Sequence, residues 1–182
     1  FLDLVSNAGI KWLALGIEAG NQMVRQEVSK GSFKDVNVRE ICKMISNHDI
    51  NIISNYIVGL PEDTYETMTD TLNLALELNT EMMNVYPCQA LPGSKLYTMA
   101  KEEGWDLPNN YEEFAFLSYE CKPLPTKYLS SMEVLKFRDY FWETYFRNPA
   151  FLKKVETKFA LQQRLNVEEM ASHKLKRKIC GD

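Results

Sequence analysis

Three short apolar segments, separated by amphipathic stretches, constrain the fold of this chain more than any other feature. They are Lys11–Ile17, Ile50–Val58 and Met82–Cys88. Their apolar residues run almost continuously and do not alternate cleanly with polar ones, which is typical of parallel strands covered by helices. Strand and helix patterns alternate along the chain, and this order predicts βαβ units with right-handed crossovers in a parallel sheet.

Helix-capping signals lie between the predicted strands. Ser32 can cap a helix that continues to Asn47, with apolar residues at the spacing of one buried face. Asp63 and Glu66 have the spacing of a capping box, which predicts a helix that begins there and continues to about Asn79. The predicted fold class is therefore α/β, with about three parallel strands and their helices.

After the third predicted strand, strand and helix patterns no longer alternate along the chain. We expect residues 1–104 to form the strand-containing unit and residues 105–182 to form an irregular linker followed by a helical extension. Three helical patterns follow the linker, at 130–147, 149–159 and 163–179. Because the first carries six aromatic residues in ten positions, on more than one stripe, we interpret it as a core helix rather than an aromatic ligand box.

Charge is unevenly distributed along the 182 residues. The formal net charge of −4 divides into −8 for residues 1–150 (13 Lys and Arg, 21 Asp and Glu) and +4 for residues 151–182 (8 Lys and Arg, 4 Asp and Glu). An acidic body argues against nucleic acid as a partner, because phosphate binding needs a basic surface. No apolar run reaches the roughly 20 residues that a membrane-spanning helix needs. We interpret the basic residues near the end of the chain as a solvated helix end: Lys174, Lys176, Arg177 and Lys178.

The cysteines are too far apart for a metal knuckle or a redox pair. Cys42, Cys88, Cys121 and Cys180 are separated by 46, 33 and 59 positions, and neither histidine lies near one of them. We therefore predict no metal site in this chain. The scattered cysteines favour the reduced thiols of a cytoplasmic protein over a disulfide framework.

Ligands of parallel α/β sheets bind at the carboxyl ends of the strands, so the residues that follow each predicted strand are candidates for a site. Glu18, between Gly16 and Gly20, could accept hydrogen bonds from a ribose hydroxyl or an amine, or could cap the next helix. Lys30 could pair with a ligand carboxylate or be solvated.

The other two strand ends leave similar alternatives open. Asn55, Ile57 and Gly59 end the second strand, where Gly59 either lets the backbone approach a planar ligand or forms an ordinary βα turn. Tyr86 and Pro87 end the third strand, and Tyr86 either stacks on a ligand ring or covers the core. The chain has no Ser/His/Asp or Cys/His arrangement, so no catalytic residue is identified.

Longer segments around these strand ends carry a family resemblance. Residues 16–22 read GIEAGNQ and residues 56–64 read YIVGLPEDT. They resemble the fourth and fifth strands of radical S-adenosylmethionine (SAM) enzymes, closest to the class that also has a cobalamin-binding domain. Ala19 and Asn21 replace serines of that class, and Asn55 replaces the first glycine of the family motif G-x-I-x-G-x-x-E.

The resemblance covers most of the chain and implies the C-terminal half of a (βα)₆ partial TIM-type barrel, strands four to six. In that family SAM chelates a [4Fe–4S] cluster and is cleaved after one-electron reduction, and the class named above also uses cobalamin. By this resemblance Glu18 contacts the ribose or amino-acid part of SAM, the backbone of Ile57–Gly59 flanks adenine, and Tyr86–Pro87 lies on its other side. Asn55 and Lys30 complete the expected cofactor-binding set.

The family's Cys-x₃-Cys-x₂-Cys cluster loop is absent from this chain. We therefore expect a fragment of a radical-SAM enzyme that acts on a small molecule by methyl transfer, oxidative cyclisation or rearrangement, with the cluster ligands elsewhere. The strand that contains Trp12 would be an exposed apolar edge, covered by the missing N-terminal part of the barrel or by another copy of the chain. Two alternatives stay open: a non-catalytic α/β binding or assembly module, and an unrelated α/β domain with its own ligand site.

Overall fold

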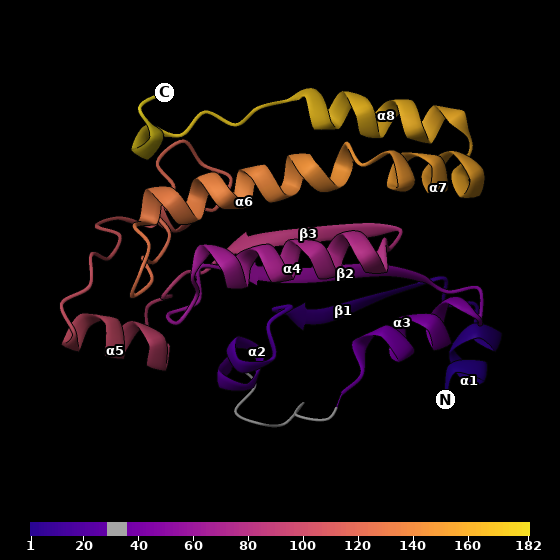
Figure 1. Cartoon of the computed structure of the whole chain (residues 1–182), viewed down its shortest axis with the longest axis horizontal. Coiled ribbons are helices and arrows are strands. Elements are labelled where there is room, and N and C mark those ends of the chain that lie inside the picture. The colour runs from indigo at the N-terminus through magenta and orange to yellow at the C-terminus, as the bar shows by residue number, and fades with distance from the viewer. Residues whose placement is uncertain (29–35) are drawn as a thin grey trace.

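The computed structural model describes residues 1–28 and 36–182. Three parallel strands form one sheet in the order β1-β2-β3. Their bounds are Trp12–Glu18, Asn51–Val58 and Met82–Pro87. The predicted three-stranded parallel sheet is confirmed, and strands adjacent in the sheet are also consecutive in the sequence (Figure 1).

Eight α-helices accompany the sheet in the described ranges. In Figure 1, α8 lies along α6 and α7 on the side away from the sheet. None of the helices in these ranges is long and apolar enough to span a membrane. In chain order the helices are α1 (Leu2–Asn7), α2 (Gln22–Val28), α3 (Val38–Ser46), α4 (Tyr65–Leu78), α5 (Lys95–Glu102), α6 (Ser131–Phe146), α7 (Pro149–Phe159) and α8 (Leu161–Ser172).

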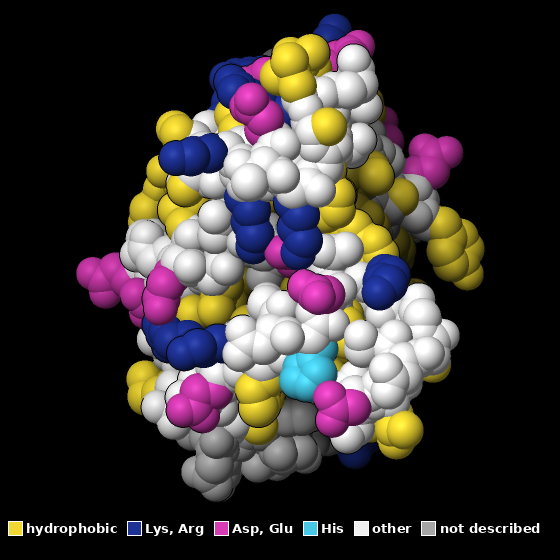
Figure 2. Space-filling model, turned by 90° about the vertical axis from the view of Figure 1, so that its right-hand side faces the viewer, with side chains coloured by type: hydrophobic (Ala, Val, Ile, Leu, Met, Phe, Trp, Pro, Cys, Tyr) yellow, Lys and Arg dark blue, Asp and Glu magenta, His cyan; other side chains and the backbone are white. Residues whose placement is uncertain are grey.

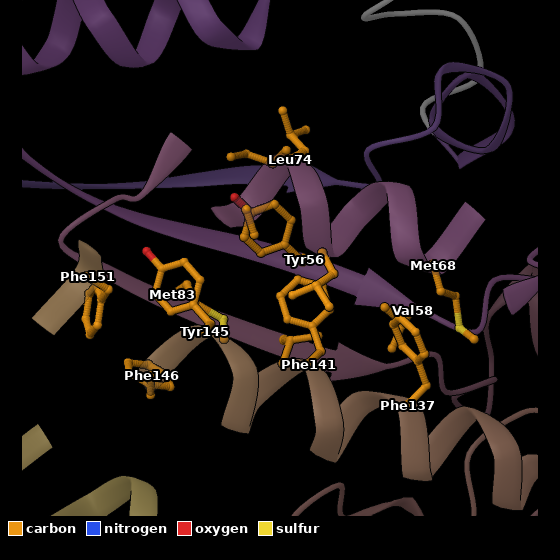
Figure 3. Packing of buried hydrophobic residues seen from close by; sticks show 14 of the residues in the cluster. Tyr56, Val58, Met68, Leu74, Met83, Phe137, Phe141, Tyr145, Phe146 and Phe151 are labelled. Atoms are coloured by element: carbon orange, nitrogen blue, oxygen red, sulfur yellow. The ribbon is translucent and has the colours of Figure 1, made fainter. Parts of the chain in front are cut away.

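One face of the sheet, which we call the packed face, lies against α4 and α6 and holds the main hydrophobic core. Tyr56 and Val58 of β2 meet aromatic side chains of α6 there (Figure 3). The ring centroids of Tyr56 and Phe141 are 5.7 Å apart. The predicted core role of the aromatic helix is confirmed, because four of its six aromatic residues are buried: Phe137, Phe141, Tyr145 and Phe146.

A buried carboxylate at the amino-terminal ends of the strands joins the sheet to α7. Glu81 accepts hydrogen bonds from the backbone N–H of Ile52 (2.9 Å) and from Lys158 (3.0 Å), and Lys154 lies 3.0 Å away. The buried charge of Glu81 is therefore paired and hydrogen-bonded. Figure 2 shows this end of the molecule, where acidic and basic side chains are interspersed.

β1 is an edge strand. Among the described residues it pairs only with β2. Trp12 of this strand is 42% exposed although its ring stacks on Phe159, with centroids 5.8 Å apart. The sheet thus has the exposed apolar edge that was expected at this strand.

The helix after β2 begins one residue later than the capping-box pattern predicts. Thr64, not Asp63, caps α4: its Oγ1 accepts from the Thr67 N–H (3.3 Å), and Thr67 Oγ1 accepts from the Thr64 N–H (3.0 Å). Asp63 is not available as the cap because its carboxylate accepts hydrogen bonds from the preceding turn. Glu66 is exposed in the first turn.

The helix before β2 is described from Val38 onward. Asn37 caps it by accepting a hydrogen bond from the N–H of Glu40 (3.3 Å). The predicted cap, Ser32, lies outside the described residues. Helix α2 was not predicted, because a helix of seven residues has too few turns to show a buried stripe.

The predicted helix over 163–179 is wrong in its last part. α8 ends at Ser172, and the chain continues without helical structure until a short 3₁₀ turn at Lys178–Cys180. Arg177 is buried, and its guanidinium donates to the Asp139 carboxylate and to two backbone carbonyls. These bonds offset the cost of burying the charge, so the prediction of a solvated helix end fails at Arg177.

Candidate ligand-binding face of the sheet

The face of the sheet opposite the packed face is sparsely covered, and we call it the open face. Toward the carboxyl ends of the strands, the parallel register and the strand alternation place five residues on it, and Glu18 joins them through a bulge. All six are exposed or partly buried, whereas the alternate residues Ile17, Tyr56 and Val85 are buried. The part of the open face near the carboxyl ends of the strands comprises Gly16, Glu18, Asn55, Ile57, Asn84 and Tyr86.

Glu18 reaches the open face through an irregularity of β1. The register with β2 shifts between Gly16 and Glu18, and Glu18 has a left-handed backbone conformation with φ of 66°. A Cβ on Gly16 would lie 2.7 Å from Oε1 of Glu18. The carboxylate therefore lies over Gly16, and glycine at that position leaves room for it.

Two asparagines continue this polar row across the sheet. Gly16, Asn55 and Asn84 are register partners on the three strands. Asn84 Nδ2 donates to Asn55 Oδ1 (3.0 Å), and Asn55 Nδ2 donates to the carbonyl of Leu15 (3.2 Å). Asn84 was missed in the sequence, where its signal is an amide in the middle of an otherwise apolar strand.

The Glu18 carboxylate has no cationic partner among the described residues. Partial burial raises its pKa above the ordinary value, because desolvation disfavours the charged form. A partly desolvated carboxylate without a partner opposes folding, and such groups are typical of sites where a ligand supplies the missing donors.

The loop after β1 is fixed by contacts with α4. Gly20 N–H donates to Thr71 Oγ1 (2.9 Å), and a Cβ on Gly20 would lie 2.6 Å from the carbonyl oxygen of Asp70. Asn21 Nδ2 donates to the Asp70 carboxylate (3.1 Å), while Asn21 Oδ1 accepts from backbone N–H groups at the start of α2. The helix-capping role that was the alternative for Glu18 is therefore filled by Asn21.

Gly59 forms a tight turn at the end of β2. Its φ is 80°, and a Cβ there would lie 2.3 Å from Cγ1 of Val134. The N–H groups of Gly59 and Leu60 donate to Asp63 Oδ2 (3.0 and 2.9 Å). Burial raises the pKa of Asp63, and hydrogen bonds from Thr67 and from this turn partly offset the shift. The chain's own packing therefore requires glycine at position 59, as in the βα-turn alternative.

The remaining residues of the predicted cofactor-binding set do not all lie on the open face. Ile57 and Tyr86 lie side by side on the open face as register partners, and the Tyr86 ring packs edge-on against Phe116 with centroids 5.0 Å apart. Register and alternation place Pro87 on the packed face, where it is buried. Lys30 lies outside the described residues.

The residues of this chain do not fit an iron–sulfur cluster. Within residues 1–28 and 36–182, no group of three or more His, Cys, Asp or Glu side chains could hold a metal ion. Burial raises the pKa of Cys88 to about 12 and that of Cys121 to about 11, which disfavours their thiolate forms. The open face, in contrast, offers a carboxylate and amides beside apolar side chains, which suits a nucleoside with an amine and hydroxyl groups.

No family model matches this chain. Its sequence is, however, similar to those of two known enzymes. The chain is 29% identical over 159 residues to the anaerobic magnesium-protoporphyrin IX monomethyl ester cyclase of Rubrivivax gelatinosus, a match that covers 86% of this chain and 27% of the cyclase. It is 29% identical over 86 residues to the tRNA-2-methylthio-N(6)-dimethylallyladenosine synthase of Psychrobacter cryohalolentis, which covers 47% of this chain and 17% of the synthase.

Both relatives are radical-SAM enzymes, so the predicted resemblance to that family is confirmed. The chain spans less than a third of the length of either relative.

Proposed function

We propose that this chain supplies strands four to six of a (βα)₆ radical-SAM barrel and that its open face is the wall against which SAM binds. The observation that carries the proposal is the row of Glu18, Asn55 and Asn84 across three sequentially ordered parallel strands. The similarity to two radical-SAM enzymes supports it. In this proposal residues 1–104 are the barrel part and residues 105–182 the extension.

The residues of the open face would bind and orient the cofactor. The Glu18 carboxylate would accept hydrogen bonds from the ribose hydroxyls or the ammonium group, and the backbone of Ile57–Gly59 and the Tyr86 ring would contact the adenine. Asn55 and Asn84 hold each other in place and present amide groups beside Glu18. SAM, when bound with a reduced cluster, supplies the radical chemistry, and the cluster ligands come from outside this chain.

The unpaired edge of β1 is the place where the remaining strands of the barrel would be added. We propose that these strands belong to the same protein, since an edge with an exposed Trp12 is otherwise open to non-specific pairing. A second copy of the chain is the alternative occupant. All four cysteines are free, which supports a reducing compartment such as the cytoplasm.

The complete coding sequence and its product test this proposal. We expect a Cys-x₃-Cys-x₂-Cys motif upstream of Phe1, and we expect the product, purified without oxygen and reduced with dithionite, to convert SAM to 5′-deoxyadenosine. The 182-residue chain alone, treated with iron and sulfide, should show no stoichiometric [4Fe–4S] absorbance. A complete product without the motif and without SAM turnover would contradict the proposal and favour a non-catalytic α/β binding or assembly module.

We propose one of three reaction classes for the complete protein. Methyl transfer, oxidative cyclisation and rearrangement of a small molecule are all consistent with the family. The names of the two relatives describe a cyclase and a methylthio-adenosine synthase. The use of cobalamin stays a prediction from the sequence.

A further inference from the structure

A cavity of about 680 Å³ lies beside the free edge of β3, between α6 and the segment that follows α8. In Figure 1 this segment returns along α6 toward the carboxyl ends of the strands. The cavity walls are mainly apolar, with contributions from Met82, Phe116, Trp142 and Met170. Its volume is in the range of pockets that enclose a small organic molecule.

The cavity adjoins the open face. Asn84 and Tyr86 line the cavity and also belong to the open face. Asn84 is hydrogen-bonded to Asn55, at the centre of the polar row. A molecule in the cavity would therefore lie next to a molecule bound on the open face.

Arg138 is a buried cation in the wall of this cavity. It is 5% exposed, and its Nε donates to the carbonyl of Val85 on the free edge of β3 (3.0 Å). Its Nη1 donates to Oδ1 of Asp139 (2.8 Å). Its Nη2 has no acceptor among the described residues, so both hydrogens of that nitrogen are left for a ligand.

The ionised side chains that line the cavity leave one positive charge in excess. Arg177 donates to both Asp139 oxygens (2.9 Å each) and to the carbonyls of Phe116 and Ser118, which uses four of its five guanidinium hydrogens within the chain. Asp139 therefore serves two buried guanidinium groups and neutralises only one. The other ionised lining residues cancel in sign: Lys136, Lys174, Glu143 and Asp182.

We propose that this cavity binds an apolar, ring-containing molecule with one carboxylate, and that the carboxylate pairs with Nη2 of Arg138. A single acidic group matches the single excess charge, and the apolar walls match the rest of the molecule. This molecule is the substrate class of the enzyme; naming it a substrate rests on the proposed function, whereas the binding preference does not.

Two matched probes test the preference on the 182-residue chain. 2-Naphthoate and its neutral analogue 2-naphthamide are titrated into ¹⁵N-labelled protein, and the indole N–H signals of the three tryptophans are followed by NMR. Only Trp142 lines the cavity, so naphthoate should shift its signal and leave those of Trp12 and Trp105 in place. Because a charge-assisted hydrogen bond is lost, naphthamide should bind at least about tenfold more weakly.

The variant Arg138→Met should remove the preference for naphthoate, and Arg138→Lys should retain part of it. Arg39→Met, which changes an exposed arginine on α3, is the matched control and should bind as the parent does. Equal binding of the two probes by the parent protein, or no shift at Trp142, would overturn the proposal even if the Arg138 variants fail to fold. Loss of SAM binding with the naphthoate preference intact would instead reject the proposed function alone.

Discussion

The two faces of the three-stranded sheet differ in burial, in polarity and in their contacts with helices. The packed face buries Tyr56, Val58 and Val85 against helices, and its aromatic contacts extend through α6. The open face carries Glu18 and a pair of asparagines, all of them only partly buried. Burial of apolar area on the packed face stabilises the fold, whereas the open face includes a carboxylate that opposes folding.

This difference separates residues that hold the fold from residues that are available to a ligand. Substitutions on the packed face should lower the free energy of unfolding, and substitutions on the open face should change binding with little loss of stability. Four predictions test this separation, in order of decreasing effect.

Phe141→Ala should produce the largest loss. The side chain is fully buried between Tyr56 and Phe137, so the substitution removes apolar burial and leaves a cavity. We expect the free energy of unfolding, measured with urea, to fall by about 3–5 kcal/mol. Tyr140→Ala on the same helix, where the side chain is 52% exposed, should cost less than about 1 kcal/mol. Similar losses for the two variants would contradict the assignment of the packed face.

Glu81→Ala should cost about 3 kcal/mol, because it leaves the Ile52 N–H unsatisfied and two lysines unpaired. Burial alone would raise the pKa of Glu81, but hydrogen bonds from Ile52, Lys158 and Lys154 outweigh it and lower the pKa. The stabilisation is therefore present above the ordinary pKa and is lost as pH falls through the lowered one.

The measurement is urea unfolding of the parent and Glu81→Ala between pH 3 and pH 7. Their difference should shrink at the acidic end. Glu77→Ala breaks an exposed pair with Arg39 and should cost at most about 1 kcal/mol. A pH-independent difference at position 81 would count against a paired, ionised Glu81.

Gly59→Ala should cost about 2 kcal/mol, through strain at φ of 80° and the close contact with Val134. Gly93→Ala is a matched control, because Gly93 has φ of 86° and a Cβ there would meet nothing within 4 Å. The difference between the stability lost in Gly59→Ala and that lost in Gly93→Ala measures the packing of the turn against α6. Val134→Ala, which removes the contacting methyl groups, should reduce this difference. Equal costs at positions 59 and 93 would mean that backbone strain alone explains the glycine.

Glu18→Gln should have the smallest effect on stability and the opposite sign. Since burial raises the pKa of Glu18, stability is highest below the ordinary pKa and falls as pH rises through the raised value. At pH 7 the glutamine variant should be more stable than the parent by about 0.5 kcal/mol or less, measured by thermal unfolding. Glu102→Gln, at an exposed position on α5, should show no such gain. A loss of stability at position 18 would mean that Glu18 has a structural partner.

The strands and the aromatic core helix were predictable because their signal is the apolar pattern itself, which burial on the packed face requires. For the candidate site, strand alternation in the sequence is enough to place Asn55 and Tyr86 on one face, and the register has them there. Nothing local to the sequence reveals the bulge that turns Glu18 onto that face. The end of the chain was not predictable. Arg177 is buried because Asp139, 38 positions away in sequence, faces it, and such a distant partner leaves no local pattern.

Titration of SAM into the ¹⁵N-labelled 182-residue chain tests the central claim most directly. The account predicts that backbone N–H signals of Glu18, Asn55, Ile57 and Asn84 shift together, that signals of α3 and α8 do not, and that Glu18→Gln weakens the response while Glu102→Gln does not. No shift on the open face at saturating SAM, or shifts confined to the helices, would contradict the assignment of this face to the cofactor.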